Sequence, residues 1–223
     1  AQEYPSEKDL VYKAAVKLRE KYGVSKGANL YLEKKLPLGA GLGGGSSDAA
    51  AALKLLNKLW GIKASPEELE QIGAELGADI PFFIKGGAAI AEGIGEKLTQ
   101  KKLNCNACVL LATPRCTVST AVAYSGVLPQ GSDRWNKFLA NSSESPLCDS
   151  WDLYNQFEET VLPAFPLIAA LKQKLNACGG KSLLSGSGSS VFSLFSSLEL
   201  AIKAYNTVKN ECRFLQISTF RTQ

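Results

Sequence analysis

The stretch that decides the fold is Pro37–Asp48, which reads PLGAGLGGGSSD. Five of the seven positions from 39 to 45 are glycine, which removes side chains that would keep a ligand off the backbone and permits positive φ angles. Ser46 and Ser47 then begin a strong helix. The unpaired N–H groups and the positive dipole end of such a helix favour an anion. The loop is therefore predicted to hold the phosphates of a nucleotide.

Three interpretations of this loop compete. A Walker P-loop needs lysine directly before its serine or threonine, and here Gly45 occupies that position. The dinucleotide fingerprint G-x-G-x-x-G is matched by Gly39, Gly41 and Gly44, but residues 50–66 lack the acidic residue expected about 20 positions later. A glycine-rich turn without a ligand is disfavoured, because flexible linkers do not usually lead straight into a well-formed amphipathic helix. A phosphate loop without lysine is the prediction that remains.

The composition is that of an ordinary globular protein. The chain has 223 residues, 45% apolar and 21% charged, enough for one large domain or two modest ones. Its net charge of +4 suits an anionic small molecule, but it has no stripe of lysine and arginine typical of nucleic-acid binding. No apolar run approaches the roughly 20 residues that span a bilayer. We therefore expect a soluble protein with neither nucleic acid nor a membrane as a partner.

The chain contains no histidine and no methionine. The first absence removes the usual catalytic triads, a histidine base and most zinc sites. The second leads us to expect that the chain starts after processing or partway through a longer protein. Six scattered cysteines favour free thiols in a reducing compartment. The pair Cys105-x-x-Cys108 lacks a second pair, so no metal site is predicted.

The periodicity of apolar residues predicts a mixture of helices and strands. Helices are expected at 6–22, 46–60, 66–76, 119–125, 151–162, 167–177 and 198–210. Strands are expected at 29–34, 86–92, 107–113, 182–185, 191–195 and 214–219. Residues 93–102 are expected to be a polar connection, and 130–146 a flexible insertion. A charged stretch at 99–106 precedes a new strand and predicts a domain boundary there.

Two capping boxes are predicted. Ser6 with Asp9 would begin the first helix, and Ser65 with Glu68 would begin the third, where Pro66 takes the first helical position.

Asp79 stands between a helix terminator and the run 80–83, IPFF, and has two interpretations. Beside proline and two phenylalanines its carboxylate would be partly desolvated and ready to accept a proton from a hydroxyl. Alternatively, it caps a short helix that starts at Pro81. From these residues alone the cap is favoured.

Three motifs, in this order, resemble the GHMP kinases, a family named for galactose, homoserine, mevalonate and phosphomevalonate. They are PLGAGLGGGSSDAAA at 37–51, LGADIPFF at 76–83 and LSGSGSSVF at 184–192. The resemblance covers essentially the whole chain and implies a two-domain α+β fold. It implies a ribosomal-S5-like nucleotide domain at 1–104 and a ferredoxin-like second domain at 105–223.

The resemblance also implies an activity: ATP-dependent phosphorylation of an alcohol group on a small molecule, with Mg²⁺. The triple glycine 43–45 is closest to the family member that phosphorylates the 2-hydroxyl of 4-diphosphocytidyl-2-C-methyl-D-erythritol in non-mevalonate isoprenoid biosynthesis. Another small-molecule GHMP kinase and a non-catalytic nucleotide-binding module are the alternatives. The expected partners are ATP and the small-molecule substrate, with a homodimer left open. The expected location is the cytoplasm, or the plastid in a plant or alga.

The family's functional residues carry over by motif. Asp79 matches the catalytic base, which also contacts the substrate hydroxyl. The other implied substrate contacts are Thr120, Tyr124, Gly186 and Ser187. The implied ATP-binding residues are Asp9, Leu10, Lys34, Pro37, Gly39, Ala40, Gly41, Leu42, Gly43, Gly44, Gly45, Ser46 and Ser47.

Some of these positions depart from the family's pattern. Asp9 stands where an asparagine next to adenine is usual, and Asp48 also replaces an asparagine. Ala121 follows Thr120, where a proline is usual. Lys34 matches a lysine near the nucleotide base, although an exposed strand residue is an alternative interpretation.

The family's Pro-Ala-Lys-x-Asn-Leu strand and Asp-Gly-Tyr-His turn are absent from this sequence. We therefore expect a chain that resembles the family's without its first several dozen residues. If no residues precede Ala1 in the protein, we expect weak or no kinase activity and an N-terminal domain lacking strands.

Overall fold

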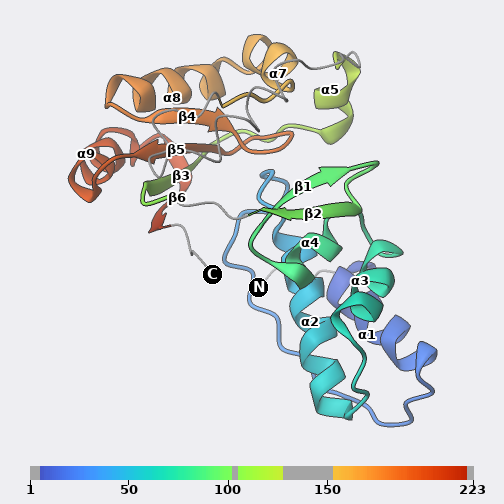
Figure 1. The fold of residues 1–223 in the computed structure, drawn as a ribbon. Coiled ribbons are helices and arrows are strands. Elements are labelled where there is room, and N and C mark those ends of the chain that lie inside the picture. Colours follow the sequence, from blue (N-terminus) through green and yellow to red (C-terminus); the bar gives the residue numbers. More distant parts are fainter. Residues whose placement is uncertain (1–5, 102–104, 128–152, 220–223) are drawn as a thin grey trace. The chain divides into compact units, whose positions relative to one another are not determined.

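A computed structural model describes residues 6–101, 105–127 and 153–219 (Figure 1). The described residues within 1–34 and 43–101 form one compact unit, and those within 35–42 and 102–223 form a second. The chain thus changes unit at residues 34–35, inside the glycine-rich stretch at 42–43, and again after 101. The domain division at 104–105 stays a prediction.

Four helices and one hairpin build the first unit. The helices are α1 (Leu10–Lys21), α2 (Gly44–Trp60), α3 (Pro66–Ala74) and α4 (Ile80–Lys85), preceded by a 3-10 turn at Ser6–Lys8. The hairpin is the antiparallel pair β1 (Ala88–Glu92) and β2 (Lys97–Lys101). Apolar side chains from all four helices share one core, which includes Leu18, Leu53, Leu56, Ile72 and Ile80.

The second unit is a four-stranded antiparallel sheet with helices. Its strands are β3 (Cys108–Pro114), β4 (Lys181–Leu184), β5 (Val191–Phe195) and β6 (Cys212–Thr219), in the spatial order β4-β5-β3-β6. Its helices are α5 (Thr120–Ser125), α7 (Glu158–Ala164), α8 (Pro166–Ala177) and α9 (Leu198–Val208). The chain order β-α-β-β-α-β with this strand order is the ferredoxin-like arrangement that was expected.

Alternating side chains of the sheet divide between its two faces, as the two-residue period of a strand requires. Leu110, Ala112 and Phe195 lie in the core that α8 and α9 cover. Val109 and Leu194 belong to a smaller cluster that includes buried Cys105.

Several predicted elements are confirmed. The capping box of Ser65 and Glu68 is present with both of its hydrogen bonds, and Pro66 begins α3. Helix α2 begins two residues earlier than predicted, at Gly44. The mixture of helices and antiparallel sheets confirms the α+β class.

Two predictions near the N-terminus are wrong. Ser6 and Asp9 form no capping box, because Asp9 is extended and is itself the cap of α1, where its Oδ1 accepts from the Val11 N–H at 2.8 Å. Residues 29–34 form no strand, and Tyr31 is 93% exposed. A strand needs a hydrogen-bonded neighbour, and no strand of the described residues pairs with this segment.

Two further boundaries differ from the predictions. Residues 97–101, expected in a polar connection, form β2, which exists through its pairing with β1. Of the helix predicted at 151–162, residues 153–157 are not helical, and α7 starts at Glu158. Asn155 accounts for the late start, because its side-chain oxygen accepts from the Phe157 N–H at 3.0 Å and stabilises a turn. The insertion predicted at 130–146 lies outside the described residues.

The cysteines follow the prediction at four positions and contradict it at one. Cys108, Cys116, Cys178 and Cys212 are free thiols. Cys105 is disulfide-bonded, so the expectation of free thiols is wrong there. Neighbouring residues cannot reveal such a bond, because a disulfide depends on which cysteines the fold brings together.

No helix in the described part of the chain has the length and apolar character needed to cross a membrane.

Candidate active site

The second half of the glycine loop forms the N-terminus of α2. Gly43 occupies the N-cap position with φ +64° and provides no capping side chain. The Ser47 N–H is the first to bond within the helix, to the Gly43 carbonyl at 2.9 Å. The N–H groups of Gly44, Gly45 and Ser46 precede that bond, as the first N–H groups of a helix do. This end of α2 therefore offers donors and a positive dipole to an anion.

Glycine is required at position 43 for two reasons. Its φ lies in the left-handed region, and a Cβ would stand 2.6 Å from Cζ of Phe83. The loop is thus packed directly on α4, which Asp79 precedes. The Ser47 hydroxyl donates to the Gly44 carbonyl at 2.8 Å, so its oxygen and not its proton is turned to other groups.

The first half of the loop is bound to the turn at 185–190, and both belong to the second unit. The Ser185 hydroxyl donates to the Gly41 carbonyl at 2.8 Å, and the Ser190 N–H donates to the Ala40 carbonyl at 3.1 Å. A Cβ on Gly41 would overlap the carbonyl oxygen of Ser185. The structure therefore joins the first and third sequence motifs through one side-chain and one backbone hydrogen bond.

Lys34 lies between two carboxylates of the first unit. Its Nζ is 2.8 Å from Oδ2 of Asp48 and 3.4 Å from Oδ2 of Asp9. Partial burial lowers the pKa of Lys34, but the hydrogen bond and charge of Asp48, together with Asp9, outweigh it, so the pKa is raised above 10.5. Asp9 thus caps α1 through Oδ1 and pairs with Lys34 through Oδ2.

Leu10 follows Asp9 and lies against the start of α2. Its Cδ1 would stand 3.6 Å from a Cβ placed on Gly45. The structure therefore brings Asp9, Leu10, Lys34 and the glycines from 43 onward into one region of the first unit. Pro37, Gly39, Ala40, Gly41 and Leu42 are placed in the second unit.

Asp79 occupies the N-cap position of α4 without capping it. Its backbone is helical, with φ −83° and ψ −16°, and its side chain makes no capping hydrogen bond. The capping interpretation is therefore wrong for this side chain. Asp79 is also exposed, so the expected desolvation by Pro81 and the two phenylalanines is wrong as well. Pro81 is buried, Phe82 and Phe83 are half-buried, and the Phe83 ring lies against Gly43.

The surroundings of Asp79 fix its backbone and leave its carboxylate accessible. Ile80 is fully buried and packs against Gly73 of α3, where a Cβ would stand 2.7 Å from Ile80 Cγ2. Gly95, in the turn between β1 and β2, would place a Cβ 4.0 Å from Oδ1 of Asp79. An exposed carboxylate on an anchored backbone can accept a proton from a bound hydroxyl.

Thr120 and Tyr124 lie on α5 in the second unit. Both are exposed, whereas Ala123 is fully buried and anchors the helix. The ring of Tyr124 packs edge-on against Phe157, with centroids 4.7 Å apart and planes at 73°. Phe157 therefore supports this ring through an edge-to-face contact, and 60% of Tyr124 is accessible.

Gly186 and Ser187 form the tip of the second glycine turn. Gly186 has φ +54°, and its carbonyl accepts from Nδ2 of Asn155 at 2.8 Å. A contact of these two residues with substrate stays a prediction.

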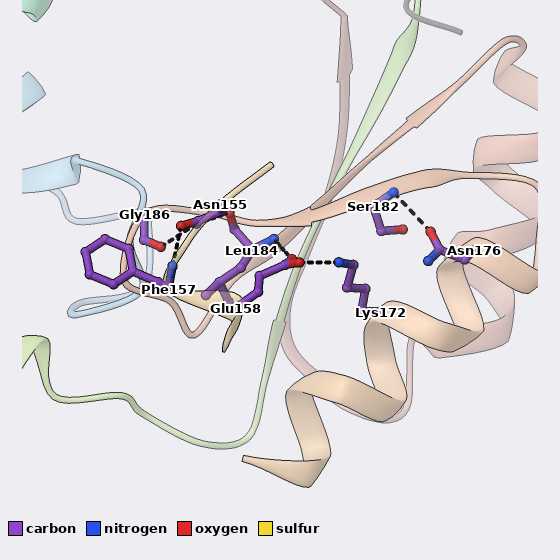
Figure 2. A network of polar contacts seen from close by, with 8 residues as sticks. All are labelled: Asn155, Phe157, Glu158, Lys172, Asn176, Ser182, Leu184 and Gly186. Carbon is purple, nitrogen blue, oxygen red and sulfur yellow. Dashed lines mark hydrogen bonds and ion pairs between the residues drawn. The ribbon is translucent and has the colours of Figure 1, made fainter. Parts of the chain in front are cut away.

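Sequence reasoning missed a polar network behind this turn. Figure 2 shows Asn155, Glu158 and Lys172 connected to the backbone of Leu184 and Gly186. The one sequence signal was Asn155 itself, because the side chain of an asparagine often forms a turn by accepting from the backbone N–H two residues on.

No group of three or more metal-ligating side chains occurs in the described ranges 6–101, 105–127 and 153–219. Magnesium usually keeps several waters and binds through one or two carboxylates plus substrate phosphates. Hydroxyls at Ser46 and Ser47 and the carboxylate of Asp48 stand at the N-terminal turns of α2. Because Asp48 Oδ2 pairs with Lys34, the serine hydroxyls are the groups at this helix end that would reach a magnesium ion held mainly by the phosphates of a bound nucleotide.

Comparisons with known proteins match this organisation. The family model described as the GHMP kinases N terminal domain matches residues 9–87, and the GHMP kinases C terminal model matches 140–213. The 4-diphosphocytidyl-2-C-methyl-D-erythritol kinase of Exiguobacterium sibiricum is 40% identical over 213 residues, covering 92% of this chain and 73% of the relative.

Two solved structures are also similar. A crystal structure of 4-(cytidine 5'-diphospho)-2C-methyl-D-erythritol kinase superposes with a TM-score of 0.82 at 31% identity, covering 99% of this chain and 81% of the other. Homoserine kinase from Cytophaga hutchinsonii gives a TM-score of 0.80 at 22% identity, covering 98% and 78% of the two chains. The second likeness concerns the fold alone.

Proposed function

Because the chain belongs to the GHMP kinase family, we propose that it phosphorylates the 2-hydroxyl of 4-diphosphocytidyl-2-C-methyl-D-erythritol with ATP. The family consists of small-molecule kinases, and the expected two-domain α+β fold is confirmed by the structural match. The observation that carries the substrate is the 40% identity to a kinase named for it. Homoserine kinase shares the fold at only 22% identity.

The N-terminus of α2 supports binding of the ATP phosphates. Phosphoryl transfer depends mainly on positioning and on stabilising the charge that spreads over the transferred group. The donors at Gly44, Gly45 and Ser46 and the helix dipole supply both without a Walker lysine. Magnesium, when bound, neutralises phosphate charge.

Asp79 is proposed as the catalytic base. Its carboxylate takes the proton of the 2-hydroxyl while that oxygen bonds to the γ-phosphorus. The bond from the γ-phosphorus to its bridging oxygen breaks, giving ADP and the 2-phosphate. The accessible, non-capping carboxylate supports this role.

Tyr124 and Thr120 are proposed to contact the acceptor. Tyr124 suits stacking on a flat base, because Phe157 supports its ring and most of the residue is exposed.

We further propose that the protein acts in the cytoplasm, where it catalyses one step in the synthesis of isoprenoid precursors. A homodimer stays a prediction.

The test is a comparison of acceptors. The full-length gene product is incubated with ATP and magnesium and with the cytidyl substrate, mevalonate or homoserine, and ADP release is measured. Phosphorus NMR then identifies the phosphorylated position. We expect turnover of the cytidyl substrate alone. Turnover of only mevalonate or homoserine would favour another kinase of the family, and nucleotide binding without turnover of any acceptor would favour a binding module.

A further inference from the structure

The side chains of Asn155, Glu158 and Lys172 form a network behind the second glycine turn, and the proposed mechanism does not use them (Figure 2). Asn155 precedes α7, Glu158 begins that helix, and Lys172 comes from α8. All three are at least partly buried.

Asn155 uses both ends of its carboxamide. Its Nδ2 donates to the carbonyl of Leu184 at 2.9 Å and to the carbonyl of Gly186 at 2.8 Å. Its Oδ1 accepts from the N–H of Phe157 at 3.0 Å. One side chain thereby joins the start of the turn, the tip of the turn and the segment that leads into α7.

Glu158 holds the other backbone group of Leu184. Its Oε1 accepts from the Leu184 N–H at 2.9 Å, and its Oε2 pairs with Nζ of Lys172. Leu184 is the last residue of β4, so its N–H and C=O are both fixed where the turn begins. The turn therefore has little freedom to shift along the strand.

The turn passes this constraint to the glycine loop. Ser185 follows Leu184, and its hydroxyl bonds to the Gly41 carbonyl at 2.8 Å. A Cβ on Gly186 would stand 3.3 Å from the same carbonyl oxygen. A change in the position of the turn must therefore move Gly41, or break its contacts.

The oxygen end of Asn155 reaches a different part of the second unit. The N–H that it holds belongs to Phe157, whose ring supports Tyr124. The Nδ2 end of the side chain thus bonds to the turn that contacts the loop proposed for ATP. The Oδ1 end bonds to Phe157, which supports the tyrosine proposed to contact the acceptor.

We propose that Asn155 is a positioning residue of the kinase, which sets the second glycine turn against Gly41 through its Nδ2 and places Phe157 against Tyr124 through its Oδ1. This inference rests on the proposed function. A residue that only stabilises the turn before α7 would use the oxygen end alone, so the two ends can be tested separately.

The first experiment uses Asn155→Asp, which keeps the oxygen and removes both donors. We expect the dissociation constant for a non-hydrolysable ATP analogue and the KM for ATP to rise about fivefold, because two neutral hydrogen bonds to the turn are lost and only part of that loss reaches Gly41. The KM for the acceptor should stay within about twofold. Asn176→Asp is the matched control, because Asn176 uses only its oxygen, accepting from the Ser182 N–H at 3.0 Å at the opposite end of β4.

A second variant tests whether Asn155 acts through the hydrogen bond from Ser185 to Gly41. Ser185→Ala removes the bond to Gly41 without touching Asn155. If Asn155 acts through this turn, the two substitutions disrupt the same contact and their effects on binding free energy should not add. The dissociation constant of the double variant should then lie within about twofold of that of the single variant that binds the analogue less tightly. Hydrogen exchange of the Ser190 amide, which bonds to Ala40, should rise in Asn155→Asp and remain at the wild-type rate in Asn176→Asp.

Unchanged analogue affinity and unchanged Ser190 exchange in Asn155→Asp would overturn the proposal. Additive losses in the double variant would also overturn it. Failure of the proposed function would give a different result, because wild-type protein would then not phosphorylate the cytidyl substrate. The affinities of wild type and variants for the ATP analogue would still test the role of Asn155. Absence of analogue binding by the wild type would refute both.

Discussion

The two halves of the glycine loop resemble each other in sequence and differ in what holds them. Ala40 and Gly41 are fixed by hydrogen bonds to Ser190 and Ser185, far away in the chain. Gly43 and the residues after it are fixed by becoming a helix. The first half has its carbonyls occupied, whereas the second half offers N–H groups. Glycine therefore allows close packing on a backbone carbonyl at Gly41, and at Gly43 it allows close packing on Phe83 and the left-handed start of α2.

The largest expected effect comes from Gly41→Ala. The new methyl group would overlap the Ser185 carbonyl, which is backbone and cannot turn away, and φ is +72°. We expect the free energy of unfolding of the second unit to fall by about 3 to 5 kcal/mol, from overpacking and left-handed strain together. Urea denaturation followed by hydrogen exchange in β4 and β5 measures the loss.

Gly39→Ala is the control for this variant. Gly39 has a similar φ of +60° but nothing within 4 Å of a Cβ, so only the strain of about 1 kcal/mol should appear. Equal losses in the two variants would show that the approach of Ser185 to Gly41 is not what constrains this half.

The next effect is that of Gly43→Ala. Its methyl group would press on the edge of the Phe83 ring at 2.6 Å, and φ is +64°. Because a ring can shift where a backbone cannot, we expect a smaller loss of about 2 kcal/mol. Hydrogen exchange should rise in α2 and α4 of the first unit, and β4 and β5 should be protected as in the wild type.

Gly45→Ala provides the comparison for position 43. Gly45 has no positive φ, and a Cβ would meet Leu10 at an ordinary 3.6 Å. Its stability should therefore match the wild type or exceed it slightly, since alanine favours a helix over glycine. If Gly45→Ala lowered the free energy of unfolding as much as Gly43→Ala, strain at the start of the helix, and not the Phe83 contact, would explain why glycine is needed at position 43.

The smallest effect concerns Lys34, which pairs with Asp48 in the helical half of the loop. Lys34→Met should cost up to about 1 kcal/mol at pH 8, because the side chains are only partly buried. The folded-state pKa of Lys34 is raised above 10.5, so the stabilisation is complete below that pH and is lost as pH rises through the folded-state value. The difference between wild type and variant should therefore shrink above pH 10.5. If the stability difference between wild type and Lys34→Met stayed constant above pH 10.5, the stability lost in the variant would come from packing of the lysine stem and not from its charge.

The sequence predicted those features that depend on neighbouring residues. The capping box at Ser65 and the helix after the glycines are local, and both are present. Strand β2 was missed because Leu98 is the one half-buried residue among exposed ones, and only pairing with β1 makes it a strand. Asn155 was missed for a related reason. Its amide bonds to residues 29 and 31 positions away, which no local pattern encodes.

The candidate site was predictable to a similar degree. The glycines and serines at the start of α2 could be proposed as an anion site from chemistry alone, because a helix N-terminus attracts anions in any fold. Their contact with a nucleotide stays a prediction. The proposed role of Asp79 could not be inferred from chemistry alone, since the residues around it favoured a cap over a desolvated carboxylate, and the structure has neither.

The central claim is that Asp79 is the base of a phosphoryl transfer. The direct measurement is single-turnover phosphorylation of the cytidyl substrate by Asp79→Asn, with calorimetric binding of a non-hydrolysable ATP analogue in parallel. We predict a rate at least about a thousandfold lower, near the upper range for loss of a general base, and analogue affinity within about twofold of the wild type. A rate within about tenfold of the wild type would contradict the account.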